Sequence, residues 1–166
     1  MRQLLRSQQT SPSPICAHLQ HWLTQHPQIH TVAAYAALPG EIDLSSLIAH
    51  HPQIRWAFPR VTGTTLKFHQ ITNPLEQLVS GYFKILEPSP TLPEIEISQI
   101  DAFLCPGLAF DPMGGRLGRG KGFYDRILAH ARPDALKIGV CHHFQQVPNT
   151  FSEPHDILMN QVICIS

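Results

Sequence analysis

The amino-acid sequence is poor in charge, in cysteine and in long apolar runs. Only 14% of its 166 residues are charged, and 12 acidic and 12 basic side chains cancel to a net charge of zero with histidine neutral. A neutral chain has no global field that would attract nucleic acid or an anionic membrane surface. Neither is therefore expected as a partner, and any charge that serves function must be local.

The four cysteines, which form no CxxC pair, are Cys16, Cys105, Cys141 and Cys164. Three lie inside apolar segments, where a thiol behaves as a small hydrophobic side chain, so we expect no disulfide framework. No apolar run approaches the ~20 residues that cross a bilayer. The N-terminal MRQLLRSQQ turns polar too early for a signal peptide. These absences together predict a reduced, soluble, cytoplasmic protein.

Short apolar strands alternate with helical patterns along the chain. A short basic helix is expected over 1–9. Apolar spacing then predicts helices over 15–26, 43–50 and 122–131, and strands over 31–38, 55–58, 66–71, 100–105, 137–141 and 161–165. This alternation is typical of a three-layer α/β/α fold with a mainly parallel sheet. No linker or repeat divides the chain, so residues 1–166 are expected to form one domain.

The most informative segment is the glycine-rich run FDPMGGRLGRGKGFYDR at 110–126. Its five glycines are costly inside a helix or strand, but they permit positive φ angles and close backbone approach to a ligand. Successive N–H groups can then point at one anion, and Arg116, Arg119 and Lys121 add positive charge. A predicted helix follows, and its first N–H groups favour negative charge. The run therefore predicts a phosphate-binding loop.

Four other interpretations of this loop fit less well. GRLGRGKG at 115–122 nearly matches the P-loop pattern GxxxxGK[ST], but Gly122 replaces the hydroxyl that binds magnesium. No GxGxxG opens a helix directly after a strand, which argues against a Rossmann dinucleotide site. An RNA-binding loop would be expected to have more aromatic stacking partners. A merely flexible loop would not normally lie between the apolar LAF and FYDRIL segments.

The segment IDAFLCPGLAFDPMGGRLGRGKGFYDRIL at 100–128 resembles, almost residue for residue, the signature of the 5-formyltetrahydrofolate cyclo-ligases, also called methenyltetrahydrofolate synthetases. Further matches follow in the family's order: YAALPGEIDL (35–44), PRV (59–61), LKFHQI (66–71), ILEP (85–88), KIGVCHHFQQVP (137–148) and EPHD (153–156). The resemblance therefore covers nearly the whole chain.

The resemblance implies an enzyme that closes a ring on a reduced folate. In that family 5-formyltetrahydrofolate becomes 5,10-methenyltetrahydrofolate while ATP is split to ADP and phosphate. The resemblance further implies Mg²⁺ as cofactor, ATP as co-substrate, and a fold near the sugar-phosphate isomerase and CoA-transferase-like group. The expected partners are small molecules, and the protein is expected to be a monomer.

The family's site residues carry over to matching positions of this chain. Arg119 and Lys121 are the implied catalytic residues. The implied ATP-binding residues are Arg2, Arg6, Arg116, Leu117, Gly118, Arg119, Gly120, Lys121, Gly122, Phe123 and Tyr124. The implied substrate-binding residues are Ala36, Glu41, Arg119, Gly120, Lys121, Gly122 and Phe123. Asp125 and Asp156 are the implied magnesium ligands, and hard carboxylate oxygens suit that ion.

Simpler interpretations of these residues remain open. Asp125 could pair with Arg126, Asp156 could be a turn residue, and Glu41 could be a solvated carboxylate. Arg2 and Arg6 could be solvated at the chain terminus. Tyr35 and Trp56 are interpreted as packing residues rather than as partners of a pterin ring.

The chain departs from the family's pattern at three places. SPSP interrupts the expected N-terminal helix, Arg2 stands where lysine is common, and Phe123 stands where tyrosine is frequent. The shortened N-terminus leaves open a non-catalytic module that holds nucleotide or RNA. A sugar-phosphate isomerase, which would need no ATP, is suggested by the fold alone.

Overall fold

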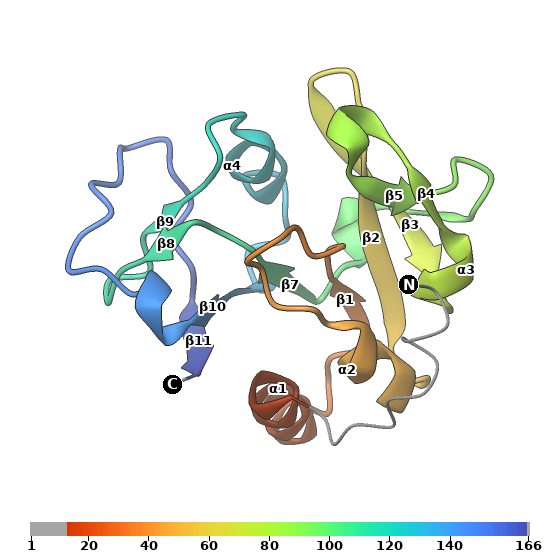
Figure 1. The fold of residues 1–166 in the computed structure, drawn as a ribbon, viewed down its shortest axis with the longest axis horizontal. Helices are drawn as coiled ribbons and strands as arrows, with labels where there is room; N and C mark the ends of the chain where they lie inside the picture. The colour runs from red at the N-terminus through yellow and green to blue at the C-terminus, as the bar shows by residue number, and fades with distance from the viewer. Residues whose placement is uncertain (1–12, 166) are drawn as a thin grey trace.

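A computed structural model describes residues 13–165. Its centre is a seven-stranded sheet in the order β11–β10–β7–β1–β2–β3–β6 (Figure 1). The pairs from β11 to β2 are parallel, whereas β3 and β6 run antiparallel to their neighbours. The predicted mainly parallel sheet is thus confirmed. Its strands are β1 Thr31–Ala33, β2 Arg55–Thr62, β3 Thr65–Ile71, β6 Glu94–Ile95, β7 Ala102–Cys105, β10 Leu136–His142 and β11 Gln161–Ile165.

Helices lie on both faces of this sheet, as predicted. Helices α1 (Pro14–Gln25) and α2 (Ser45–His50) cover one face, and α4 (Phe123–Leu128) covers the other (Figure 1). Within residues 13–165 no helix is long and apolar enough to cross a bilayer. The remaining short elements are α3 Pro74–Gln77, β4 Leu78–Ser80, η1 Tyr82–Lys84, β5 Leu86–Pro88, η2 Ile97–Gln99, β8 Ala109–Phe110, β9 Arg116–Leu117 and η3 His143–Gln145.

The central strands are apolar on both faces because each face carries a helical layer. Along β2, Trp56 and Phe58 pack into the core beneath α1 and α2, whereas Ala57 between them faces the α4 side. Val32 and Ala33 divide in the same way on β1. Successive side chains of a strand point to opposite faces, so a run of apolar residues is what a doubly covered parallel strand requires.

The strand predicted over 31–38 ends much earlier, at Ala33. The Ala34 N–H still donates to Ala57 O at 2.8 Å, but the chain then leaves the sheet. Its neighbour β7 stops at Cys105, just before Pro106, which has no N–H to offer. The apolar residues that follow Ala34 therefore form part of a cavity wall instead of a strand.

Two further expectations are corrected by local hydrogen bonding. The strands expected at 55–58 and 66–71 are longer and form an antiparallel hairpin, with Gly63 at φ 61° in its tight turn. Helix α4 has six residues instead of the ten expected. The helix ends in a tighter turn of the 3₁₀ type, because the N–H groups of His130 and Ala131 donate hydrogen bonds to the carbonyls three residues before them. The helix expected over 1–9 lies outside the described residues.

Candidate active site

The glycine-rich loop begins around a buried carboxylate, Asp111. Asp111 Oδ1 accepts hydrogen bonds from Met113 N and Gly115 N, both at 2.9 Å, and Oδ2 accepts from Thr150 N at 2.9 Å and Thr150 Oγ1 at 2.6 Å. The Thr150 side chain, with the backbone bonds, holds the pKa of Asp111 below its ordinary value. A Cβ at Gly115 would collide with this cluster, so glycine is needed there for space. Asp111 thereby ties the loop to the segment around Thr150.

After Asp111 the loop forms a short pair of strands and then continues into α4. Strands β8 and β9 pair antiparallel across it, which the sequence did not predict. Gly122 occupies the N-cap position of α4 with φ 68°, a conformation that costs other residues free energy. The three cations of the loop meet different partners.

Arg116 is a buried anchor, whereas Arg119 and Lys121 are accessible. The Arg116 side chain is 5% exposed, donates to Pro106 O at 3.2 Å and lies 3.6 Å from Asp125 Oδ2. It also lies over the Tyr124 ring, 5.2 Å from the centroid. The Arg119 side chain is 47% exposed, and Lys121 is exposed with Nζ 4.7 Å from the centre of the Phe83 ring. Two of the three cations therefore face the space that a ligand could occupy.

Glu41 meets the glycine loop across 78 positions of sequence. Arg119 Nη2 lies 3.4 Å from Glu41 Oε1, and Leu38 N donates to Glu41 Oε2 at 2.9 Å. The Glu41 side chain is only 8% exposed. The pairing places Glu41, which is implied to bind substrate, beside Arg119, which is implied to be catalytic. Glu41 is therefore not the solvated carboxylate of the simpler interpretation.

The two carboxylates implied as magnesium ligands belong to adjoining segments. Asp125 Oδ1 accepts from Ile157 N at 3.1 Å, which places α4 against the segment that carries Asp156. Asp156 Oδ2 accepts from Glu153 N at 2.7 Å. The simpler pairing of Asp125 with the next residue, Arg126, is not found: Arg126 donates to Thr64 O instead. Among residues 13–165 no group of three or more His, Cys, Asp or Glu is arranged to hold a metal ion.

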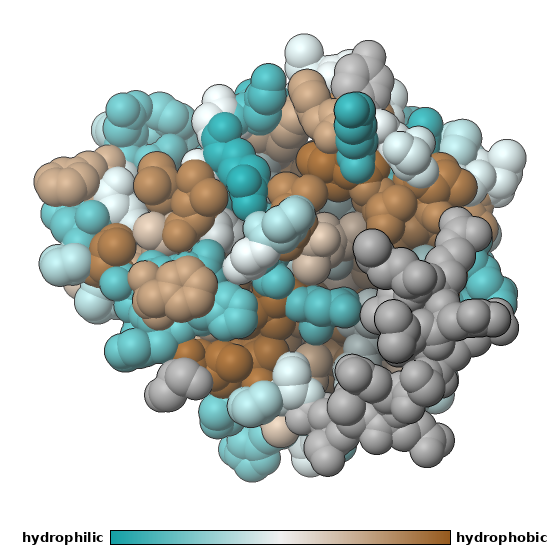
Figure 2. Space-filling model, in the orientation of Figure 1, coloured by the Kyte–Doolittle hydropathy of each residue, from teal (hydrophilic) through white to brown (hydrophobic). Residues whose placement is uncertain are grey.

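Every candidate residue that the structure describes lines one cavity of about 390 Å³, namely Ala36, Glu41, residues 116–125 and Asp156. Pro59, Val61, Leu66, Phe83 and Leu86 form an apolar wall of the same cavity. Figure 2 shows hydrophobic side chains gathered over the β4–β5 hairpin and the neighbouring part of β2. A second cavity, of about 550 Å³ around Met113 and Gln146, contains none of the candidates. The candidate site thus combines a charged wall with an apolar one.

The β4–β5 hairpin was not predicted, although it supplies part of the apolar wall. Glu87, 3% exposed, accepts from Val61 N at 3.1 Å and lies 3.5 Å from Arg60 Nη1, which donates to Pro88 O at 3.0 Å. Together these bonds fasten the hairpin to β2. At its tip, Phe83 and Lys84 have left-handed φ angles of 56° and 58°. The connection does contain Gly81, a turn signal that the sequence prediction did not use, but the strands beside it are only three residues long.

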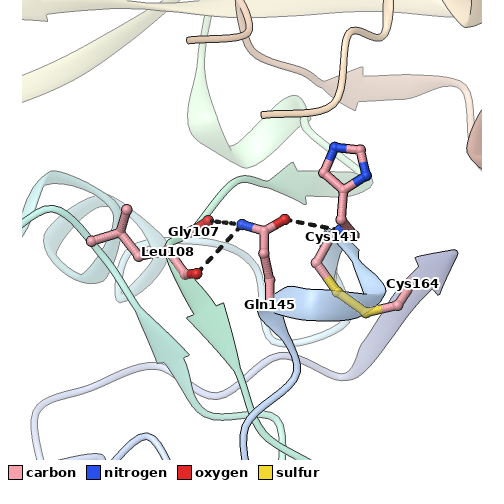
Figure 3. Close-up of a disulfide and its surroundings, with 6 residues drawn as sticks. Gly107, Leu108, Cys141, Gln145 and Cys164 are labelled. Carbon is pink, nitrogen blue, oxygen red and sulfur yellow. Dashed lines mark hydrogen bonds between the residues drawn. A yellow bond between two sulfur atoms is a disulfide. The ribbon is translucent and has the colours of Figure 1, made fainter. Parts of the chain in front are cut away.

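The cysteines were expected to be reduced and to form no disulfide framework, but one pair of them is bonded. Cys141 on β10 and Cys164 on β11 are directly paired in register, with Cα atoms 4.7 Å apart, and their sulfur atoms are bonded (Figure 3). The apolar segments around them gave no sign of this, because the contact depends on which strands become neighbours. Cys16 and Cys105 are buried and free. Near the disulfide, Gln145 Nε2 donates to Gly107 O at 2.8 Å, at the edge of the cavity (Figure 3).

Asp111 was not among the predicted site residues, although the segment FDPMGG carries a detectable signal. Aspartate followed by proline and glycine commonly accepts hydrogen bonds from the backbone of its own turn, as Asp111 does. Arg2 and Arg6 lie outside the described residues. For the other candidates the structure brings the side chains together, and their individual roles stay predictions.

The chain is similar to known proteins over most of its length. Residues 5–165 match the model of the 5-formyltetrahydrofolate cyclo-ligase family. A 5-formyltetrahydrofolate cyclo-ligase of Mycoplasma genitalium is 35% identical over 88% of this chain and 79% of its own. One of Mycolicibacterium smegmatis is 44% identical over 52% of this chain, and that match spans 45% of the relative. The 5,10-methenyltetrahydrofolate synthetase structure of Aquifex aeolicus superposes with a TM-score of 0.78 and 30% identity, over 90% of this chain and 75% of its own. The chain therefore belongs to the 5-formyltetrahydrofolate cyclo-ligase family.

Proposed function

We propose that the chain converts 5-formyltetrahydrofolate to 5,10-methenyltetrahydrofolate, with ATP split to ADP and phosphate. Family membership gives the reaction class. The observation that carries the proposal is the meeting of Arg119, Lys121 and Glu41 at one cavity, opposite an apolar wall. A reduced folate needs an apolar surface for its ring system, and ATP needs cations and N–H groups for its phosphates.

The chemistry explains why ATP is required. A formamide oxygen is a poor leaving group, so direct ring closure would be slow. Transfer of the terminal phosphoryl group of ATP to that oxygen releases ADP and leaves an iminium-like carbon. The neighbouring folate nitrogen attacks this carbon and loses its proton to the solvent, and phosphate departs with the original formyl oxygen. Nothing in these steps needs an oxidant or reductant.

The residues of the loop serve this reaction by position and charge. Phosphoryl transfer gains most from alignment of the reacting groups and from neutralising the oxygens of the transferred phosphate. Arg119 and Lys121 are the accessible cations of the cavity wall and would contact the transferred group. Arg116, buried and paired with Asp125, would act instead by keeping the loop and α4 in register.

Asp125 and Asp156 would hold Mg²⁺ at the edge of this cavity. Mg²⁺ is usually held by one or two protein carboxylates together with phosphate oxygens and water, rather than by a complete protein cage. Two carboxylates in adjoining segments, both lining the cavity, fit that donor set. Bound there, the ion would reduce the charge of the ATP phosphates. The carboxylates themselves are oriented by the N–H groups of Glu153 and Ile157.

The test is an assay of methenyl-folate absorbance with protein, 5-formyltetrahydrofolate, ATP and Mg²⁺. Lys121→Ala is expected to lower the rate at least about 100-fold, because it removes a positioned charge that stabilises the transition state. Lys67→Ala is the matched control, because Lys67 does not line the cavity and forms an exposed pair with Glu94. Equal rates for the wild type and Lys121→Ala would contradict the proposal.

A further inference from the structure

One buried glutamine connects the central sheet to the glycine-rich loop. Gln145 lies in η3, just after β10, and is only 8% exposed. Its Nε2 donates to Gly107 O at 2.8 Å and to Leu108 O at 3.4 Å (Figure 3). Its Oε1 accepts from His142 N at 2.8 Å. The acceptor and the donor of this amide therefore bind two different segments of backbone.

The side chain reaches the second segment because two neighbouring strands end at different heights. Gly139 of β10 pairs with Cys105, the last residue of β7, whereas β10 continues to His142. The chain then turns in η3, and the His142 N–H closes a capping box with the Gln145 side chain. The amide is thus oriented by the sheet before it meets the residues that follow β7.

The peptide unit between Gly107 and Leu108 passes this connection on to the loop. Its C=O accepts from Gln145, and its N–H donates to Leu117 O at 2.7 Å. A peptide unit is planar, so a rotation that breaks one of these hydrogen bonds also misdirects the other. Leu117 belongs to β9, within the glycine-rich loop, and lines the cavity. The Gln145 amide therefore orients backbone that carries the loop.

The Arg116 side chain lies against the same peptide unit. A Cβ at Gly107 would lie 3.1 Å from the Arg116 side chain and 2.9 Å from the Phe110 ring, so the peptide is closely packed. Arg116 Nη1 also donates to Pro106 O at 3.2 Å, one peptide earlier. A change in the orientation of this peptide would therefore move Arg116 as well as the β9 backbone.

Gln145 does not itself line the cavity, whereas Gly107 does. Its effect on a ligand must therefore pass through the peptide that it holds. The next hydrogen bond between the two segments, from Val147 N to Phe110 O at 2.8 Å, joins residues that also lie outside this cavity wall. Gln145 thus holds the end of the segment that faces the cavity.

We propose that Gln145 is a positioning residue for phosphoryl transfer. By donating to Gly107 O, its amide holds the glycine-rich loop in the orientation that aligns Arg119 and Lys121 with the phosphates of ATP. This assignment rests on the proposed function, because it takes ATP as the ligand of the loop. Phosphoryl transfer depends on alignment, and a displacement of about 1 Å can lower its rate about 100-fold.

Gln145→Glu tests the donated hydrogen bond alone. A glutamate carboxylate still accepts from His142 N and keeps the capping box, but it has no N–H to donate to Gly107 O. The variant is expected to lower kcat at least about tenfold and to raise the KM for ATP several-fold, because the loop is no longer aligned. The KM for 5-formyltetrahydrofolate should change less than about twofold.

Gln99→Glu is the matched control. Gln99 closes a capping box of the same type in η2, where its Oε1 accepts from Glu96 N at 3.2 Å. It is exposed and does not line the cavity, so this variant should leave kcat and both KM values unchanged. Equal losses in the two variants would overturn the proposal. A folate KM that rises as much as the KM for ATP would also overturn it, because the whole cavity would then have loosened.

Amide hydrogen exchange, followed by NMR, gives a readout that needs no activity. In Gln145→Glu the Leu108 N–H should exchange about tenfold faster, because its peptide is held on one side only. Unchanged exchange would overturn the proposal. If Gln145→Glu does not fold, Gln145→Met, which adds no charge, replaces it and should show the same kinetic and exchange changes.

Failure of the proposed function is a separate result. The wild-type protein would then not convert 5-formyltetrahydrofolate, and the exchange measurement would still decide whether Gln145 holds the loop. Turnover by the wild type with an unaffected kcat in the Gln145 variant refutes the positioning role alone.

Discussion

Single side chains determine how the glycine-rich loop is held. The Asp111 carboxylate accepts hydrogen bonds from backbone N–H groups on both sides of the loop entrance and from the Thr150 hydroxyl. Five glycines give the loop little stiffness of its own, so a buried charge that gathers several donors is an effective support. Removing this charge should therefore affect stability as well as nucleotide binding.

Asp111→Asn is expected to lower the free energy of unfolding at pH 7 by about 1–3 kcal/mol, because buried donors lose a charged acceptor. Since the folded-state pKa of Asp111 is lowered, its contribution is complete above the unfolded-state pKa of about 3.9. It is lost as the pH falls through the folded-state pKa. Urea titrations of both proteins should show the difference shrinking below about pH 4.

Asp134→Asn serves as the control for that experiment. The Asp134 side chain is 78% exposed and pairs with Arg132, and an exposed pair of this kind contributes little. Its substitution should leave the unfolding free energy nearly unchanged at either pH. A stability difference between wild type and Asp111→Asn that stays constant from pH 7 to about pH 3 would show that the Asp111 charge is not responsible.

Among the elements, the β4–β5 hairpin connects the sheet to the cavity. Glu87 and Arg60 fasten the hairpin to β2, and its tip places Phe83 against Lys121. The close approach of Glu87 to Gly81 leaves no room for a side chain there. The left-handed φ angles at Phe83 and Lys84 cost free energy that the attachment must offset.

Glu87→Gln should loosen this hairpin and raise the KM for the folate several-fold, with a smaller effect on the KM for ATP. The unfolding free energy should fall by about 1–3 kcal/mol, since a buried charged hydrogen bond is lost. Glu94→Gln breaks the exposed pair with Lys67 and should cost less than about 1 kcal/mol without changing either KM. Steady-state kinetics and urea unfolding on both variants check this. A larger effect at Glu94 would contradict the role given to the hairpin.

Elements with strong local patterns were predicted well, and elements that exist only through pairing were not. Helix α1 was expected over 15–26 and spans Pro14–Gln25, because Ile15, Leu19, Trp22 and Leu23 recur at helical spacing and Ser13 caps the first turn. The β8–β9 and β4–β5 pairs are too short to show a period. The Cys141–Cys164 bond likewise depends on β10 and β11 becoming neighbours, which no local pattern shows.

For the whole molecule, the sequence predicted the parallel sheet with helices on both faces but not the antiparallel edge. β3 reverses direction because Gly63 closes a tight hairpin after β2, and β6 pairs antiparallel with β3 and so runs the same way as β2. The candidate residues follow the ends of several strands, so the sheet itself gathers positions 36, 41, 116–125 and 156 around one cavity. Family resemblance identified those positions; only the fold could show that Arg119 contacts Glu41 and that Arg116 is buried.

Phosphoryl transfer to the formyl oxygen is tested most directly by following that oxygen. The substrate would be labelled with a heavy oxygen isotope in its formyl group and converted by the wild-type protein with unlabelled ATP and water. Mass spectrometry of the released phosphate should then find one labelled oxygen per phosphate, with one ADP formed per methenyl-folate. Unlabelled phosphate, or methenyl-folate formed without ADP, would contradict phosphoryl transfer to the formyl oxygen at this site.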